Sequence, residues 1–139
     1  MATLTNKLTL TGTAADFGQA LSFNYSKDMT VQKPWTGISR LKIDATSAED
    51  TVLDAIDSRR FVYIKHTGLD SAGAATTEKL YIEVDDGDQA GVPSERIGYL
   101  KSGEWCFFPL DDTDGTSNLV AETSAGDVII EYAYWTVED

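Results

Sequence analysis

Few side chains in this sequence have the chemistry of a catalytic centre, because it holds only one histidine and one cysteine. Nucleophilic catalysis by Ser or Cys normally requires a base, usually histidine, within hydrogen-bonding distance of the nucleophile. His66 ends an apolar segment directly before a glycine-containing loop, which favours a solvated or hydrogen-bonded loop histidine. Cys106 lies within the apolar segment 105–108, where a buried structural thiol is expected. We therefore expect no catalytic residue and no enzyme activity.

Metal and cofactor sites are equally poorly supported. Zinc and iron sites need several Cys or His ligands at short spacing, and one cysteine with one histidine cannot supply such a set. The acidic segments 85–88 and 111–115 contain glycine and could offer carboxylates to calcium, but neither continues to the spaced acids and final Glu of an EF-hand loop. Solvated turns are favoured there. No glycine-rich phosphate loop, dinucleotide fingerprint or G-x-S-x-G motif occurs, so we expect no metal and no cofactor.

Two binding or catalytic alternatives stay open. Any two of the 23 acidic residues could approach one another in a cleft, as in glycoside hydrolases. Exposed aromatic side chains can also stack against sugar rings. Trp35 is the best candidate for such a platform, because Pro34 and Gly37 beside it predict a loop over 33–37. The other tryptophans and tyrosines are expected in the core or an interface.

Length and charge restrict the class of protein and its partners. The 139 residues fit one domain, spanning 1–139. The formal net charge of −12 repels both nucleic-acid phosphates and anionic lipid headgroups, so neither is an expected partner. The N-terminal residues lack the features of a signal peptide, and no apolar run is long enough to cross a membrane. A single cysteine excludes an intrachain disulfide and favours synthesis in a reducing cytoplasm.

Period-two alternation of apolar and polar residues, interrupted by turn residues, dominates the sequence. Its clearest example is segment 79–85, where Leu80, Ile82 and Val84 share one face. Segment 46–50 could instead cap a short helix towards Ile56, or 51–57 could be a strand. We predict an all-β fold, an antiparallel β-sandwich of jelly-roll-like type with about eight to ten strands, although an immunoglobulin-like sandwich or small barrel also fits. The expected strands are 4–10, 21–25, 38–43, 52–56, 61–65, 79–85, 97–100, 105–110, 119–122 and 128–137.

The last predicted strand is apolar on both faces. Such a strand could be central in a sheet covered by loops, or could lie against another subunit. Aromatic residues are enriched in the cores of interfaces. The sequence-based candidates for a subunit interface are therefore Tyr132, Tyr134, Trp135 and Val137.

Three stretches resemble small structural proteins of tailed bacteriophages, the head decoration or cement proteins with β-sandwich or jelly-roll folds. They are residues 60–68 (RFVYIKHTG), where such proteins often have Asn in place of His66; residues 97–110 (IGYLKSGEWCFFPL), a strand, glycine turn and strand ending in Pro-Leu; and residues 121–132 (AETSAGDVIIEY), a closing hairpin before an aromatic strand. Together they are spread over residues 60–132, about half of the chain. The first sixty residues match nothing in these proteins.

The resemblance implies a virion structural protein that cements the exterior of a capsid, with the major capsid protein as partner and a homotrimer as assembly. It also implies that residues 1–60 include an attachment or strand-exchange segment, and that the protein assembles in the host cytoplasm. An acidic domain suits a shell exterior, where no contact with the packaged genome is needed. The alternative is a carbohydrate- or receptor-binding module of a phage tail or another particle.

Overall fold

The computed structural model describes residues 2–13, 20–45, 49–85, 95–111 and 115–137, and all of its regular secondary structure there is β-strand. The described strands form two antiparallel sheets. Their bounds are β1 Ala2–Gly12, β2 Leu21–Trp35, β3 Ser39–Ile43, β4 Asp50–Leu53, β5 Arg60–His66, β6 Leu80–Asp85, β7 Glu95–Leu100, β8 Trp105–Leu110, β9 Asn118–Thr123 and β10 Val128–Val137.

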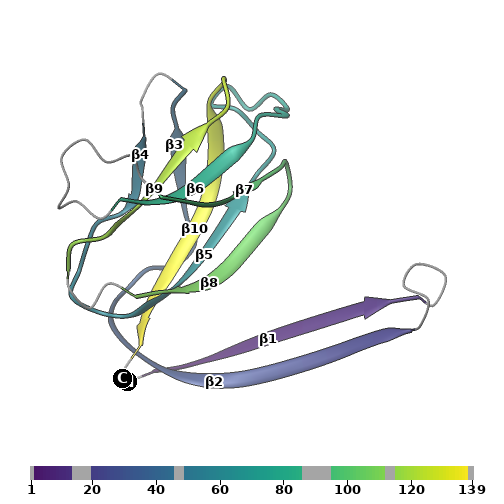
Figure 1. Cartoon of the computed structure of the whole chain (residues 1–139), viewed down its shortest axis with the longest axis vertical. Coiled ribbons are helices and arrows are strands. Elements are labelled where there is room, and N and C mark those ends of the chain that lie inside the picture. Colours follow the sequence, from purple (N-terminus) through teal and green to yellow (C-terminus); the bar gives the residue numbers. More distant parts are fainter. Residues whose placement is uncertain (1, 14–19, 46–48, 86–94, 112–114, 138–139) are drawn as a thin grey trace.

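The two sheets face one another as a sandwich, which confirms the predicted all-β class and antiparallel β-sandwich (Figure 1). The larger sheet has the order β1-β2-β10-β5-β8, and β3 also pairs with β10. The smaller sheet has the order β4-β9-β6-β7. The jelly-roll connectivity stays a prediction.

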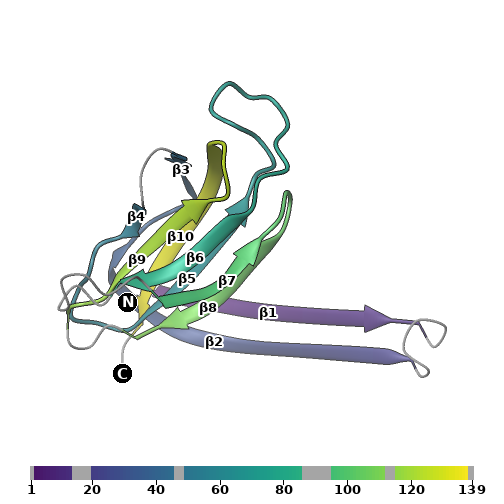
Figure 2. The same ribbon diagram turned by 45° about the horizontal axis from the view of Figure 1, so that its top comes forward.

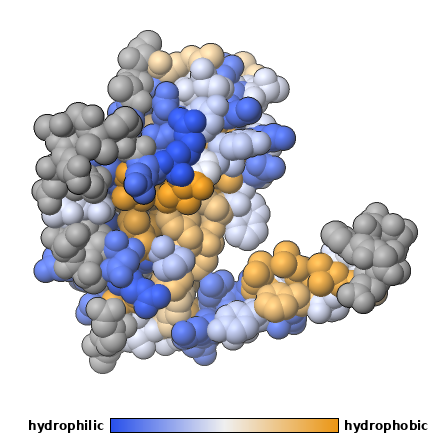
Figure 3. Space-filling model, viewed as in Figure 1, coloured by the Kyte–Doolittle hydropathy of each residue, from blue (hydrophilic) through white to orange (hydrophobic). Residues whose placement is uncertain are grey.

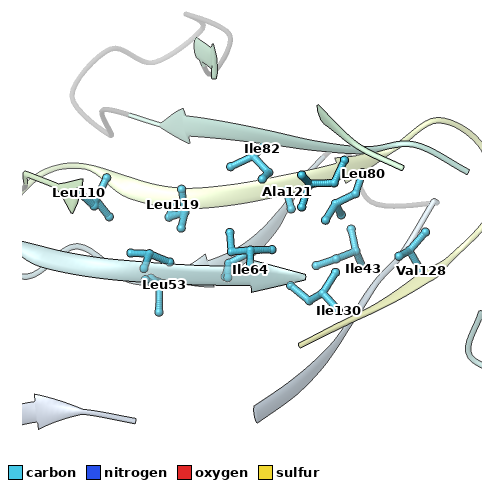
Figure 4. Packing of buried hydrophobic residues seen from close by; sticks show 13 residues of the cluster. Ile43, Leu53, Ile64, Leu80, Ile82, Leu110, Leu119, Ala121, Val128 and Ile130 are labelled. Atoms are coloured by element: carbon cyan, nitrogen blue, oxygen red, sulfur yellow. The ribbon is translucent and has the colours of Figure 1, made fainter. Parts of the chain in front are cut away.

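Alternation along the strands fills the space between the sheets with aliphatic side chains (Figure 4). In β5, Val62 and Ile64 point inward and are fully buried, whereas Phe61 and Tyr63 lie on the opposite face and are half-buried. Burial of apolar area at roughly 25 cal/mol per Å² is the main force that holds the sheets together. The buried core residues are Ile43, Val52, Leu53, Val62, Ile64, Leu80, Ile82, Leu100, Leu110, Leu119, Ala121, Val128 and Ile130.

A long hairpin of β1 and β2 leaves the sandwich as a projecting arm (Figures 1 and 2). The two strands pair without interruption from Ala2↔Val31 to Gly12↔Leu21. Only the end of β2 joins the sandwich, where Val31, Gln32 and Trp35 pair with the end of β10. We call this hairpin the arm, and its residues 2–5 and 28–35 the base of the arm.

The sequence predicted the first part of β2 but not its second half. A loop over 33–37 was expected from Pro34 and Gly37, yet β2 continues to Trp35, so that prediction was wrong for residues 33–35. The strand continues because alternate residues Met29 and Val31 are buried against the sandwich. For the ambiguous segment after residue 45, β4 confirms a strand at residues 51–53, but residues 54–57 are not strand, and residues 46–48 lie outside the described residues.

Strand β10 lies in the interior of the larger sheet, between β5 on one side and both β2 and β3 on the other. Its inner face contributes Val128 and Ile130 to the core. Near the C-terminal end of β10, its outer face is covered by the base of the arm. The strand is therefore apolar on both faces because residues of the same chain cover both.

Candidate functional site

The only histidine is a structural residue at the end of β5. His66 is fully buried. Its Nδ1 accepts a hydrogen bond from the Gly68 amide at 2.9 Å, which leaves Nε2 to carry the proton and donate to the Glu78 carbonyl oxygen, also at 2.9 Å. Both ring nitrogens therefore hold the loop after β5 in place, and the side chain is hydrogen-bonded within the protein instead of solvated.

Cys106 lies on β8, half-buried, with its side chain packed against the core. Burial raises the pKa of this thiol to about 11, well above the ordinary value. Since the thiolate is the reactive form, this environment suits a structural residue, as the sequence indicated.

The acidic residues Glu83 and Glu122 share one cation on the outer face of the smaller sheet. Arg96 bonds the Glu83 carboxylate at 2.6 Å and the Glu122 carboxylate at 3.1 Å, and its guanidinium lies 3.7 Å from the centre of the Tyr81 ring. This cluster ties β6, β7 and β9 together. Within the described residues, no group of three or more His, Cys, Asp or Glu is placed to hold a metal. Most of the two acidic loops, residues 86–88 and 112–114, lies outside that part of the chain.

The four residues predicted for a subunit interface fall into two places. Tyr132 and Tyr134 are half-buried and pack against the main core. Trp135 and Val137 lie on the outer face of β10, in a second cluster beneath the base of the arm. That cluster consists of Met29, Val31 and Val137, with Leu4, Phe61, Phe107 and Trp135 packed around it.

The structure adds an exposed apolar feature on the arm, which the sequence did not single out. The pairing register places Leu8 opposite Tyr25, Leu10 opposite Phe23 and Gly12 opposite Leu21, so these side chains share one face of the hairpin. Between 39% and 52% of each large side chain is exposed. Figure 3 shows hydrophobic residues along the side of the arm that faces the open space beside the sandwich. We call Leu8, Leu10, Leu21, Phe23 and Tyr25 the apolar strip.

The opposite face of the arm is polar and rich in threonine. Thr5 donates a hydrogen bond of 2.7 Å to its cross-strand partner Asp28. Thr9 and Asn24 oppose one another further along this face. The arm is thus an amphipathic two-stranded ribbon, and beyond its base no other described strand pairs with it.

An isolated two-stranded hairpin is only marginally stable in water, and a third strand or a packing surface is normally needed. The base of the arm has such a surface in the second cluster. Between the base and the sandwich, a crevice of about 370 Å³ opens beside Met29, Phe61, Arg59 and Val137. The apolar strip continues the same face of the hairpin outward, without a described surface to cover it.

The outer face of the larger sheet carries a row of aromatic residues. Phe61 and Phe107 stack with ring centres 5.3 Å apart, and Phe107 lies 6.2 Å from Trp135. Tyr63 and Trp105 extend this row beyond the base of the arm, with ring centres 6.4 Å apart. We call Tyr63 and Trp105 the aromatic extension; 57% of Trp105 is exposed.

Trp35, the predicted exposed aromatic, ends β2 and is 52% exposed. It borders a shallow crevice with Ala2, Val31, Gln32 and Lys33. The sequence singled out Trp35 but not the apolar strip, because the alternation that produces the strip is the same as that of a strand with one buried face.

No family model matches this chain, and neither a curated protein nor a solved structure shows significant similarity to it. No helix long and apolar enough to span a membrane occurs within the described ranges.

Proposed function

We propose that this chain is a structural protein of a tailed-bacteriophage particle, which decorates and cements the capsid by binding between major capsid subunits on the shell exterior. The observation that carries the proposal is the projecting arm with its exposed apolar strip. Contiguous exposed apolar surface on a small protein marks an interaction site. Such an arm gives the chain a surface with which to bind other proteins. The resemblance of its second half to cement proteins suggests that the partner is a phage capsid.

Charge and stability agree with this role. The acidic chain is repelled by packaged nucleic acid and gains nothing from an internal location. A cement protein needs no chemistry, because a ligand that binds only the assembled shell stabilises it by mass action. The proposal includes self-association, with the homotrimer that the resemblance implies.

Co-sedimentation with capsid shells tests the proposal. Purified chain is mixed with shells that lack it and pelleted, with chain alone as the control for self-aggregation. We expect the chain to pellet with the shells up to a fixed number per shell and to raise the temperature at which the shells open. Chain that stays in the supernatant at every shell concentration contradicts the proposal.

A carbohydrate- or receptor-binding module is the second candidate, and the exposure of Trp35 beside a shallow crevice favours it. Sugar rings stack on such side chains. If this candidate is right, Trp35→Ala abolishes retardation by a polysaccharide in affinity electrophoresis. Tyr99→Ala is the matched control, because Tyr99 is an aromatic residue of similar exposure that lies on β7 of the smaller sheet.

A further inference from the structure

We propose that the apolar strip of the arm packs on the outer face of the larger sheet in a second copy of this chain, over the aromatic extension formed by Tyr63 and Trp105. Each copy then donates its arm to one neighbour and receives an arm from another. The partner is identified by three features of the chain itself: a contact that it already makes, a surface that it leaves exposed, and its charge distribution.

The contact already present is that between the base of the arm and its own sheet. Leu4, Met29 and Val31 lie on the same face of the hairpin as the apolar strip, and they pack against Phe61, Phe107 and Trp135. This face of the arm is therefore complementary to this face of the sheet.

The exposed surface is the continuation of that same sheet face. Phe61 and Tyr63 are alternate residues of β5, and Phe107 and Trp105 are alternate residues of β8, so the aromatic extension lies on the face that the base of the arm covers. Trp105 remains 57% exposed. The arm of the same chain leaves the sandwich at this point and projects away from it (Figure 2). A neighbour's arm can cover what its own arm does not.

The distribution of charge favours the same partner. The first 35 residues contain three lysines and two aspartates, whereas the other 104 contain eight basic and 21 acidic residues. Two acidic sandwiches repel one another, but a weakly basic arm can approach an acidic sandwich without that penalty. Electrostatics therefore favour arm-to-sandwich contact over contact between two sandwiches.

An arm-to-sheet contact joins two different surfaces, so copies assemble head to tail and close into a ring when the rotation permits. This inference rests on the self-association included in the proposed function, and it is independent of binding to a capsid. Shell binding by a monomer would leave the capsid role standing and overturn the arm exchange.

The first test changes the apolar strip without touching the sandwich. Leu10→Asp with Phe23→Asp places two carboxylates on the apolar face at one cross-strand pair. The matched control is Thr9→Asp with Asn24→Asp, the adjacent cross-strand pair on the polar face, which adds the same charge at the same distance along the arm. By light scattering, we expect the first variant to have the 15.1 kDa mass of one chain and the control to keep the mass of the wild-type assembly. Equal masses for the two variants overturn the proposal.

The second test changes the receiving surface. We expect Trp105→Asp to give single chains, whereas Ile97→Asp, a change of equally exposed apolar residue on the smaller sheet, leaves the assembly intact. Assembly of Trp105→Asp like the wild type would show that arms pack on one another instead, and would overturn the arm-to-sheet contact.

Mixing the two defective variants completes the test. Leu10→Asp/Phe23→Asp keeps an intact sheet face, and Trp105→Asp keeps an intact arm. We expect an equimolar mixture to form a species of two chains, although neither variant associates alone. A mixture that stays at the mass of one chain contradicts a head-to-tail contact. Circular dichroism of each variant establishes that the sandwich is folded.

Discussion

At the scale of single residues, the two side chains with the most reactive chemistry have structural roles. His66 holds the turn after β5 through both ring nitrogens, and Cys106 is packed against the core. Cys106 was predicted in this role, because apolar neighbours on a strand indicate burial. The burial of His66 was not predicted, because its hydrogen-bond partners come from backbone groups in a turn and at residue 78, which the local pattern does not specify.

Replacing His66 should destabilise the fold. In His66→Ala the Gly68 amide and the Glu78 carbonyl lose their partners and a cavity remains, so we expect a loss of about 2–4 kcal/mol in the free energy of unfolding, measured with urea. The exposed Thr77→Ala, in the same part of the chain, serves as the control and should change it by less than about 0.5 kcal/mol. A loss of similar size in both variants would argue against the role of the ring.

The thiol of Cys106 should react slowly in the folded protein. Its pKa of about 11 lies roughly two units above that of an unfolded chain, so at pH 8 alkylation by iodoacetamide should be about a hundredfold slower in the native protein than in urea. The rates are measured by mass spectrometry with a small thiol as reference. Equal rates in the native and unfolded states would show that this thiol is accessible and ordinary in pKa.

At the scale of elements, alternation identified most strands but could not distinguish a strand in the sandwich from a strand in the arm. Leu8 and Leu10 alternate with polar residues just as Leu80 and Ile82 do, yet the first pair is exposed and the second is buried. Which face is covered depends on pairing between distant segments, and local alternation does not encode that pairing. Strand β10 is the opposite case. Its second apolar face looks unpartnered in the sequence, but it is covered by a hairpin more than ninety residues away.

The outer part of the arm should be dispensable for the stability of the sandwich. Deleting residues 7–26 and joining Asn6 to Lys27, which are cross-strand partners, through an Asn-Gly turn keeps the base of the arm. We expect the free energy of unfolding of this monomer to stay within about 1 kcal/mol of that of the Leu10→Asp/Phe23→Asp monomer.

The base of the arm provides the contrast. Met29→Ala with Val31→Ala removes buried side chains of the second cluster from a full-length arm, and we expect a loss of at least about 2 kcal/mol. Thermal or urea unfolding of the two variants compares them directly. A deletion that costs as much as the double substitution would show that the outer arm supports the sandwich of its own chain.

At the scale of the whole molecule, an acidic sandwich carries a nearly neutral arm, and one of the two exposed faces of this arm is apolar (Figure 3). This division separates two tasks. The sandwich has its own core and carries most of the negative charge, whereas the arm carries the uncovered apolar strip, which we propose is covered on association. The composition of the chain predicted an acidic globular domain. The apolar strip could be recognised only from the pairing of β1 with β2, which places five large side chains on one uncovered face.

Arm-mediated assembly is tested by the molar mass of the purified wild-type chain, measured by light scattering over a wide range of concentrations. We expect the mass to rise with concentration to a fixed multiple of 15.1 kDa, three chains if the resemblance to cement proteins extends to the assembly. A mass of 15.1 kDa at every concentration would contradict it, because the apolar strip and the aromatic extension would then remain exposed without covering one another.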